Sequence, residues 1–214
     1  MGNNNKEMNL KSLTRSNGRT YTLKDNKDRF FYPDELEKYE DKLKTKQKHS
    51  SKILLQTGAR INEVRNVKIS DIDFVNKRIV LRVTKTKAKK GEKRGRIRTI
   101  PISTQFSRYL KKYCNNNKLT DDDYIGVIST PAMNIAMKKA ARLAGLKNPE
   151  DFSPHNLRKT LETWLMSLGV QDSALLAHFG HDIKTAASHY VSPDVFSWNE
   201  KKQIRAIIGD LYER

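Results

Sequence analysis

Apolar residues recur every three or four positions over much of the chain, and this is the spacing of one face of an α-helix. Residues 131–144 follow this spacing up to Gly145, and residues 157–168 follow it up to Gly169, because glycine frequently ends a helix. The same signals predict a helix that starts at Pro33, a helix over 48–56, a helix over 172–179, a short helix that carries Tyr190, and a C-terminal helix that includes 204–211. Most of the chain is therefore expected to be helical.

Two segments have the composition of β-strands. Residues 78–84 and 96–102 are rich in β-branched side chains and partly alternate apolar with polar positions. Residues 85–98, which include the connection between them, carry eight Lys or Arg. A hairpin with such a basic tip is suited to contact a groove or the backbone of DNA. The predicted fold is mainly α with a small antiparallel β-sheet, in the α+β class.

The pattern divides the chain into three parts. Residues 1–29 are polar, basic and rich in Asn, and we expect a flexible N-terminal arm that either contacts DNA or is an irregular terminus. Residues 30–197 are expected to form one domain, since this length is sufficient to bury a core. Residues 198–214 are expected to form an amphipathic C-terminal helix, which packs either on its own domain or on a neighbouring copy of the chain.

The charge of the chain favours a polyanionic partner. The sequence has 42 Lys and Arg against 24 Asp and Glu, so that its formal charge is +18 over 214 residues. Such a surface attracts phosphates without regard to sequence, and double-stranded DNA is the expected partner. A membrane surface is disfavoured, because the sequence has no clear basic amphipathic helix and no lipidation signal.

Other sequence features exclude several classes of protein. No apolar run approaches the length of a membrane span and no signal peptide opens the chain, so we expect an intracellular protein in contact with the genome. Cys114 is the single cysteine, which excludes an intrachain disulfide and makes a Cys/His zinc site implausible. No Walker loop or dinucleotide fingerprint occurs. We therefore predict no cofactor and no metal site.

Five residues stand out as candidates for chemistry, although each has an ordinary explanation when taken alone. His155 and Arg158 share one face near the start of a helix and could simply be solvated there. His181 directly follows a glycine that ends a helix, and it could cap that helix. Tyr190 is one of eight tyrosines, most of which should pack in the core, and Arg60 could belong to a surface ion pair.

Taken together, the five residues suit the attack of a tyrosine on a DNA phosphate. Phosphoryl transfer needs a nucleophile, positive charge at the phosphate oxygens and a proton donor for the leaving oxygen. Two guanidiniums can clamp the oxygens, two imidazoles can hydrogen-bond them and manage the proton, and a tyrosine can hold the covalent phosphodiester. A lysine of the basic hairpin can protonate the departing oxygen. This chemistry requires no metal ion.

Three sequence boxes carry a resemblance to a known family. They are TGARINEV at 57–64, SPHNLRKT at 153–160 and LAHFGHDIKTAASHYV at 176–191. With these boxes, the chain resembles the catalytic domain of the tyrosine recombinases, the phage-integrase and Xer-type enzymes, from about Phe30 to Ser197. The resemblance implies the fold of that catalytic domain. It also implies site-specific DNA recombination through a 3′-phosphotyrosyl intermediate, by a tetramer on paired sites and without ATP.

The resemblance also implies roles for individual residues. The catalytic set that it assigns to this chain is Arg60, Lys85, His155, Arg158, His181 and Tyr190. Glu63 lies at the supporting acidic position of the family. Lys85 follows the first predicted strand directly, and Lys87 is the alternative because this hairpin is long and rich in lysine.

The chain departs from the family pattern in ways that keep other functions open. Phe179 stands where leucine is usual and Lys159 where histidine is common, and both changes are mild. Residues 1–29 stand where family members usually carry a helical domain that closes a clamp around DNA. The chain is therefore either a fragment or a minimal recombinase that grips DNA with a basic arm. The alternatives are DNA relaxation like that of a type IB topoisomerase, and DNA binding without catalysis.

Overall fold

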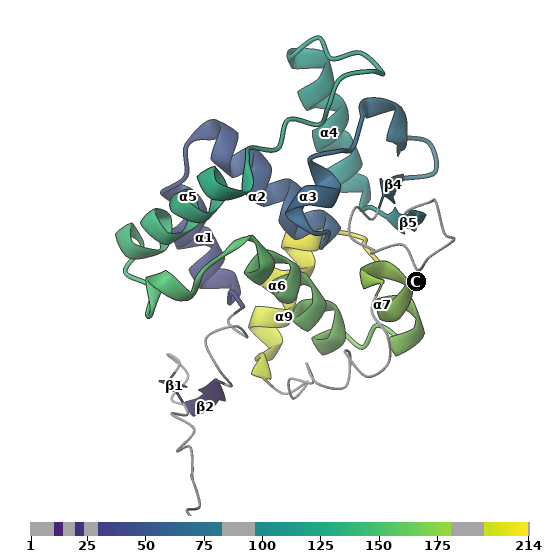
Figure 1. The fold of residues 1–214 in the computed structure, drawn as a ribbon. Helices are drawn as coiled ribbons and strands as arrows, with labels where there is room; N and C mark the ends of the chain where they lie inside the picture. Colours follow the sequence, from purple (N-terminus) through teal and green to yellow (C-terminus); the bar gives the residue numbers. More distant parts are fainter. Residues whose placement is uncertain (1–10, 15–19, 24–29, 83–96, 181–194, 214) are drawn as a thin grey trace, which may run out of the picture.

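The fold is built mainly from helices, as the sequence predicts. The computed structural model describes residues 11–14, 20–23, 30–82, 97–180 and 195–213 (Figure 1). Helix α6 contacts α2, α5, α7 and α9, so it is the central helix. The α-helices of the described residues are α1 (Pro33–Asp41), α2 (Thr45–Thr57), α3 (Ile61–Val64), α4 (Thr104–Asn116), α5 (Thr130–Leu143), α6 (Pro154–Ser167), α7 (Asp172–Phe179) and α9 (Trp198–Ile208), with short 3-10 turns η2 (Ile69–Asp71) and η3 (Pro149–Asp151).

A small antiparallel sheet packs beside the helices. Its strands are β3 (Ile72–Asp73), β4 (Arg78–Arg82) and β5 (Ile97–Pro101), in the order β3-β4-β5. Ile79 of β4 pairs with Ile100 of β5, and both are buried, so one face of the sheet joins the core. Strand β5 also contacts α7. The predicted fold class, mainly helical with a small antiparallel sheet, is confirmed.

Two further strands lie in the segment for which the sequence predicts a flexible arm. β1 (Lys11–Thr14) and β2 (Thr20–Leu23) pair antiparallel, with Lys11 opposite Leu23 and Thr14 opposite Thr20. The sequence pattern did not predict this pair, because strands of four residues give almost no periodic signal.

Helix α6 is buried on nearly all sides. Leu157 and Leu161 are fully buried, as the leucine spacing predicts. The polar positions do not form a solvated face, since Arg158 is 1% exposed and Thr160 is 0% exposed. Inside the protein the Thr160 hydroxyl accepts a hydrogen bond from the backbone N–H of Phe31 at 2.9 Å. The helix that carries two candidate residues is therefore part of the core, and the buried Thr160 hydroxyl finds a partner there.

The segment 30–32 anchors the start of the domain on α6. The carbonyl of Phe31 accepts a hydrogen bond from the indole N–H of Trp164 at 3.0 Å. The ring of Phe30 packs against the ring of Phe196, with 5.8 Å between their centroids. Aromatic side chains from the two ends of the domain thus meet in one cluster beside α6.

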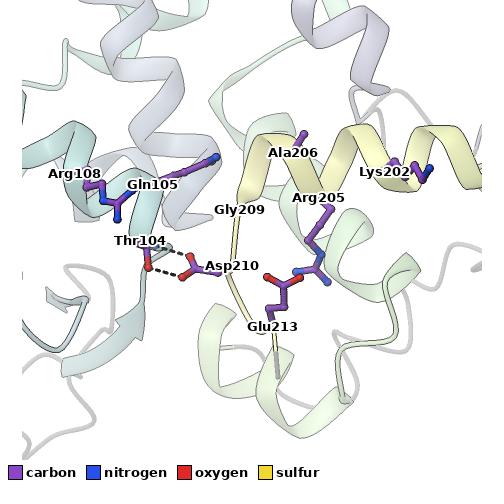
Figure 2. A pocket seen from close by; sticks show the side chains of 9 residues that line it. All are labelled: Thr104, Gln105, Arg108, Lys202, Arg205, Ala206, Gly209, Asp210 and Glu213. Carbon is purple, nitrogen blue, oxygen red and sulfur yellow. Dashed lines mark hydrogen bonds between the residues drawn. The ribbon is translucent and has the colours of Figure 1, made fainter.

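The C-terminal segment packs on its own domain in this single chain. Ile204 and Ile208 of α9 are fully buried, and α9 contacts α1 and α6. Beyond the helix, the carboxylate of Asp210 accepts hydrogen bonds from the backbone N–H of Thr104 at 2.5 Å and from its hydroxyl, beside a pocket between α4 and α9 (Figure 2). Docking of residues 198–214 on a neighbouring copy stays a prediction.

Helix α4 is one that the sequence pattern did not predict. Phe106, Leu110 and Cys114 are spaced four residues apart and are buried. The Ser103 hydroxyl caps the helix by accepting a hydrogen bond from the backbone N–H of Phe106 at 3.2 Å. Both signals are present in the sequence, but polar residues outnumber apolar ones along α4 and obscure them.

Gly58 ends α2 in the left-handed conformation, with φ of +54°, and leaves no room for a side chain. A Cβ atom there would lie 2.5 Å from Cε1 of Phe179 and 3.0 Å from Cδ2 of Leu161. Gly58 comes two residues before Arg60. The turn that carries Arg60 therefore depends on close packing between the end of α2 and helices α6 and α7.

We predict that Gly58→Ala is more destabilising than Gly169→Ala. Gly169 also has a positive φ, +78°, but a Cβ atom there meets nothing within 4 Å. Gly169→Ala should therefore cost only the left-handed strain of about 1–2 kcal/mol. Gly58→Ala should add about 1–3 kcal/mol of overpacking. Urea unfolding followed by circular dichroism measures both losses, and equal losses would contradict the packing described for Gly58.

Candidate active site

Arg158 holds together the two turns on which candidate residues lie. Its guanidinium donates from Nη1 to the carbonyl of Gly58 at 2.8 Å and from Nη2 to the carbonyl of Phe179 at 2.5 Å. These carbonyls lie at the ends of α2 and α7. The guanidinium carbon also lies over the ring of Phe179, 5.0 Å from its centroid. Arg158 therefore fixes both the turn before Arg60 and the turn that contains Gly180.

The charges around Arg158 favour an anion. Burial, together with the positive charges of Arg60 and Arg98, lowers the pKa of Arg158 to about 10. The guanidinium still carries its charge at neutral pH, because this pKa remains well above 7. The negative charges of Glu63 and Glu162 act in the opposite direction on Arg158. Three guanidiniums with these two carboxylates still leave net positive charge, which a phosphate could offset.

Glu63 is the carboxylate that orients Arg60. It is 2% exposed, and it accepts hydrogen bonds from Nη1 of Arg60 and from the backbone N–H of Arg60, each at 3.0 Å. Burial raises the pKa of Glu63, but hydrogen bonds and charge from Arg98 and Arg60 outweigh burial and hold the pKa below its ordinary value. The side chain of Arg60 is 47% exposed. Its guanidinium is thus anchored on one side and accessible to a ligand.

Arg98 is a residue of this cluster that the sequence pattern missed. It lies on β5 and donates to both carboxylate oxygens of Glu63, at 3.2 and 2.7 Å. A signal for it exists in the sequence, because Arg98 lies two and four residues before Ile100 and Ile102, which are both buried. Residues at this spacing share one face of a strand, so the pattern places Arg98 on the inward face.

His178 is the second residue that the sequence pattern missed. Its Nε2 lies 3.0 Å from the carbonyl oxygen of Thr57, and its Nδ1 lies 2.9 Å from the hydroxyl oxygen of Tyr212. Because a carbonyl oxygen only accepts, Nε2 carries the proton and the Tyr212 hydroxyl donates to Nδ1. Burial lowers the pKa of His178 to about 4, so the ring is neutral. His178 thereby joins the C-terminal segment to the turn after α2.

The structure brings Arg60 and Arg158 together and places His155 along the same helix as Arg158. His155 is exposed in the first turn of α6, one turn before the buried Arg158. The other candidates lie outside the described residues, and their parts in the site stay predictions; they are Lys85, Lys87, His181 and Tyr190.

The described ranges hold no group of three His, Cys, Asp or Glu side chains that could bind a metal ion. In those same ranges, no helix is both long and apolar enough to cross a membrane. Arg60, Arg98, Arg158 and Glu63 form one cluster of charged groups in these ranges, and guanidiniums of this kind bind phosphate oxygens well.

Comparisons with known proteins give matches to one family. The model described as "Phage integrase family" matches residues 29–195. Tyrosine recombinase XerA of Saccharolobus solfataricus is 34% identical over 155 residues, which are 71% of this chain and 48% of the relative. A probable integrase/recombinase of Acholeplasma phage L2 is 30% identical over 156 residues, which are 72% of this chain and 50% of the relative. The chain thus spans about half the length of these curated relatives.

Solved structures share the fold of this chain. A crystal structure of XerA recombinase matches with a TM-score of 0.61 and 20% identity, over 83% of this chain and 64% of the other. XerH site-specific recombinase bound to difH substrate matches with a TM-score of 0.58 and 18% identity, over 91% of this chain and 59% of the other. The Tn1549 transposon integrase in complex with transposon right end DNA matches with a TM-score of 0.59 and 20% identity, over 84% of this chain and 65% of the other. The predicted likeness in fold to tyrosine recombinases is confirmed.

We predict that His178 makes the fold sensitive to mild acid. Its pKa falls from 6.5, the ordinary value, to about 4 in the folded protein. Between these values the unfolded state binds more protons than the folded state, so stability decreases as the pH falls. The share of His178 in this decrease should be about 2 kcal/mol between pH 7 and pH 5.

Urea unfolding of the wild type and of His178→Gln at pH 7 and pH 5 measures this share. The variant should lose about 2 kcal/mol less than the wild type between the two pH values, because glutamine does not titrate. The matched control is His49→Gln, which replaces a different buried histidine. The loss of stability of this variant between pH 7 and pH 5 should still include the contribution of His178. Equal pH dependence in the wild type and His178→Gln would contradict the buried, neutral state of His178.

Proposed function

The chain belongs to the phage integrase family, and on this premise we propose that it is a site-specific DNA recombinase that cuts and rejoins double-stranded DNA. The observation that carries the proposal is the arginine cluster around Glu63 at the ends of α2 and α7, which suits a phosphate. The formal charge of +18 supports a polyanionic substrate. Two proteins of similar fold, XerH and the Tn1549 integrase, have been solved with DNA.

In the proposed reaction, the phenolic oxygen of Tyr190 attacks a scissile phosphate. A bond from phosphorus to the tyrosine forms and the bond to the 5′-oxygen breaks, which leaves a 3′-phosphotyrosyl link and a free 5′-hydroxyl. His155 takes the phenolic proton, and Lys85 gives a proton to the departing oxygen. A 5′-hydroxyl of another duplex then attacks the link, rejoins the DNA and releases the tyrosine.

The two arginines of the proposed set have different roles at the phosphate because they differ in burial. Arg60 is half-exposed, so its guanidinium is the one that contacts the oxygens of the phosphate. Arg158 is buried, and it adds positive charge to the site while it holds the carbonyls of Gly58 and Phe179. His181 supports the phosphate with a hydrogen bond. Charges that are fixed before the substrate arrives stabilise the transition state without reorganisation.

We propose that the active assembly is a tetramer on paired sites, in the cell compartment that holds the genome. Recombination cuts both strands of two duplexes, so four copies supply one tyrosine for each strand. A closed ring of four copies needs a contact between neighbours. Residues 198–214 are the proposed contact, and because Ile204 and Ile208 are buried on their own domain in the single chain, docking on a neighbour would exchange these contacts for equivalent ones on the next copy.

We predict that the wild type forms a covalent adduct with a nicked duplex that carries its target site, even in the presence of EDTA. The nick lets the cut fragment diffuse away, so the protein stays linked to the DNA and migrates as a slower band in a denaturing gel. Tyr190→Phe should abolish this band, because phenylalanine has no oxygen to attack the phosphorus.

Tyr212→Phe is the control that separates the two tyrosines. The Tyr212 hydroxyl is bound to His178, and burial raises its pKa to about 12, which makes it a poor nucleophile. Tyr212→Phe should lose about 1 kcal/mol of stability and still form the adduct. An adduct that persists in Tyr190→Phe and disappears in Tyr212→Phe would overturn the assignment of the nucleophile. Plasmid relaxation without any recombinant product would instead favour a topoisomerase.

A further inference from the structure

The guanidinium of Arg98 donates hydrogen bonds to two different elements of the site. From β5, it donates to both oxygens of Glu63 at 3.2 and 2.7 Å, and from Nε to the carbonyl of His178 at 3.1 Å. Its side chain is 11% exposed. The planar guanidinium thus reaches α3 on one side and the last turn of α7 on the other, a geometry that the single ammonium of a lysine does not offer.

Both elements lead directly to residues of the proposed reaction. Glu63 holds the side chain and the backbone of Arg60, as described above. The carbonyl of His178 lies two residues before Gly180, where a Cβ atom would lie 3.5 Å from Cδ and from Nη1 of Arg98. The guanidinium of Arg98 is therefore packed against the end of α7, and His181 is the next residue in the sequence.

We propose that Arg98 is a positioning residue for DNA cleavage, which acts through Glu63 on Arg60. This inference rests on the recombinase function proposed above. Arg98 does not need to touch the phosphate, because its guanidinium is already committed to the carboxylate and the carbonyl. Its effect on the reaction is to keep the Glu63 carboxylate, and with it the Arg60 guanidinium, in one place.

The electrostatics of Glu63 explain why Arg60 depends on Arg98. Burial alone would raise the pKa of the Glu63 carboxyl, and Arg98 supplies the largest opposing contribution through its hydrogen bonds and its charge. Without Arg98, Arg60 would be the one charged partner left to the buried carboxylate among the described residues, and removing one partner of a buried pair is strongly unfavourable. The Arg60 guanidinium would then either turn further onto the Glu63 carboxylate or separate from it. In both cases the guanidinium would leave the position that suits the phosphate.

The test is a double-mutant cycle between Arg98→Gln and Arg60→Ala. The rate of adduct formation is measured in single turnover on the nicked duplex, at saturating protein. Arg98→Gln should slow cleavage by about 10- to 100-fold in the wild-type background, as expected for a misplaced charge. In the Arg60→Ala background it should slow cleavage by less than about 2-fold, because the group that it positions is already absent. A merely structural ion pair would give the same factor in both backgrounds.

Arg82→Gln is the matched control, since it removes another arginine of the same sheet that pairs with a carboxylate, Asp71. Arg82→Gln should cleave at the wild-type rate, and its DNA affinity and that of Arg98→Gln, measured by filter binding, should be similar. Arg98→Lys is measured in parallel, because it keeps a charge in the site if Arg98→Gln does not fold. It should recover part of the rate and show the same dependence on Arg60.

Two results would overturn the positioning role of Arg98, and a third would overturn the proposed function instead. A folded Arg98→Gln or Arg98→Lys that cleaves as fast as the wild type would overturn the positioning role. An equal loss of rate in the two backgrounds would overturn it as well. If the wild type itself forms no adduct while it binds DNA, the proposed recombinase function fails, and that outcome is recognised before any variant of Arg98 is measured.

Discussion

The buried guanidinium of Arg158 joins the core of the protein to the candidate site. A charge inside a protein is costly unless its donors are satisfied, and Arg158 satisfies two of them with the carbonyls of Gly58 and Phe179. Those carbonyls belong to the ends of two helices that are far apart in the sequence. The same helix, α6, packs its leucines in the core and sends the guanidinium to these ends. The core and the candidate site are therefore stabilised by one element and should be lost together.

The turn after α2 shows how separate helices converge on one short segment. The carbonyl of Thr57 accepts from His178 of α7, and the carbonyl of Gly58 accepts from Arg158 of α6. Arg60, at the outer end of the turn, pairs with a buried carboxylate of α3. A segment that is held at successive positions has little freedom left to lose when a phosphate binds. Positive charge that is preorganised in this way is what phosphoryl transfer requires from a protein.

Local features of this fold could be predicted from the sequence, whereas features that depend on distant partners could not. Gly58 and Gly180 end helices in the left-handed conformation, as their places after helical segments indicate. The candidate arginines were found from motif spacing, but the burial of Arg158 depends on carbonyls of other helices. Arg98 and His178 were missed because their partners lie 35 and 121 residues away in the sequence. The spacing of Arg98 from the buried Ile100 and Ile102 is the one local sign that its side chain points inward.

We propose that the scissile phosphate binds at the cluster built on Arg158. A crystal structure of Tyr190→Phe bound to a duplex with its target site would show where this phosphate lies. We expect the guanidinium of Arg60 within about 3.2 Å of a non-bridging oxygen of that phosphate. We also expect Arg158 to keep its bonds to the carbonyls of Gly58 and Phe179. A scissile phosphate bound away from Arg60, or an Arg158 released from both carbonyls in the complex, would contradict this placement of the phosphate.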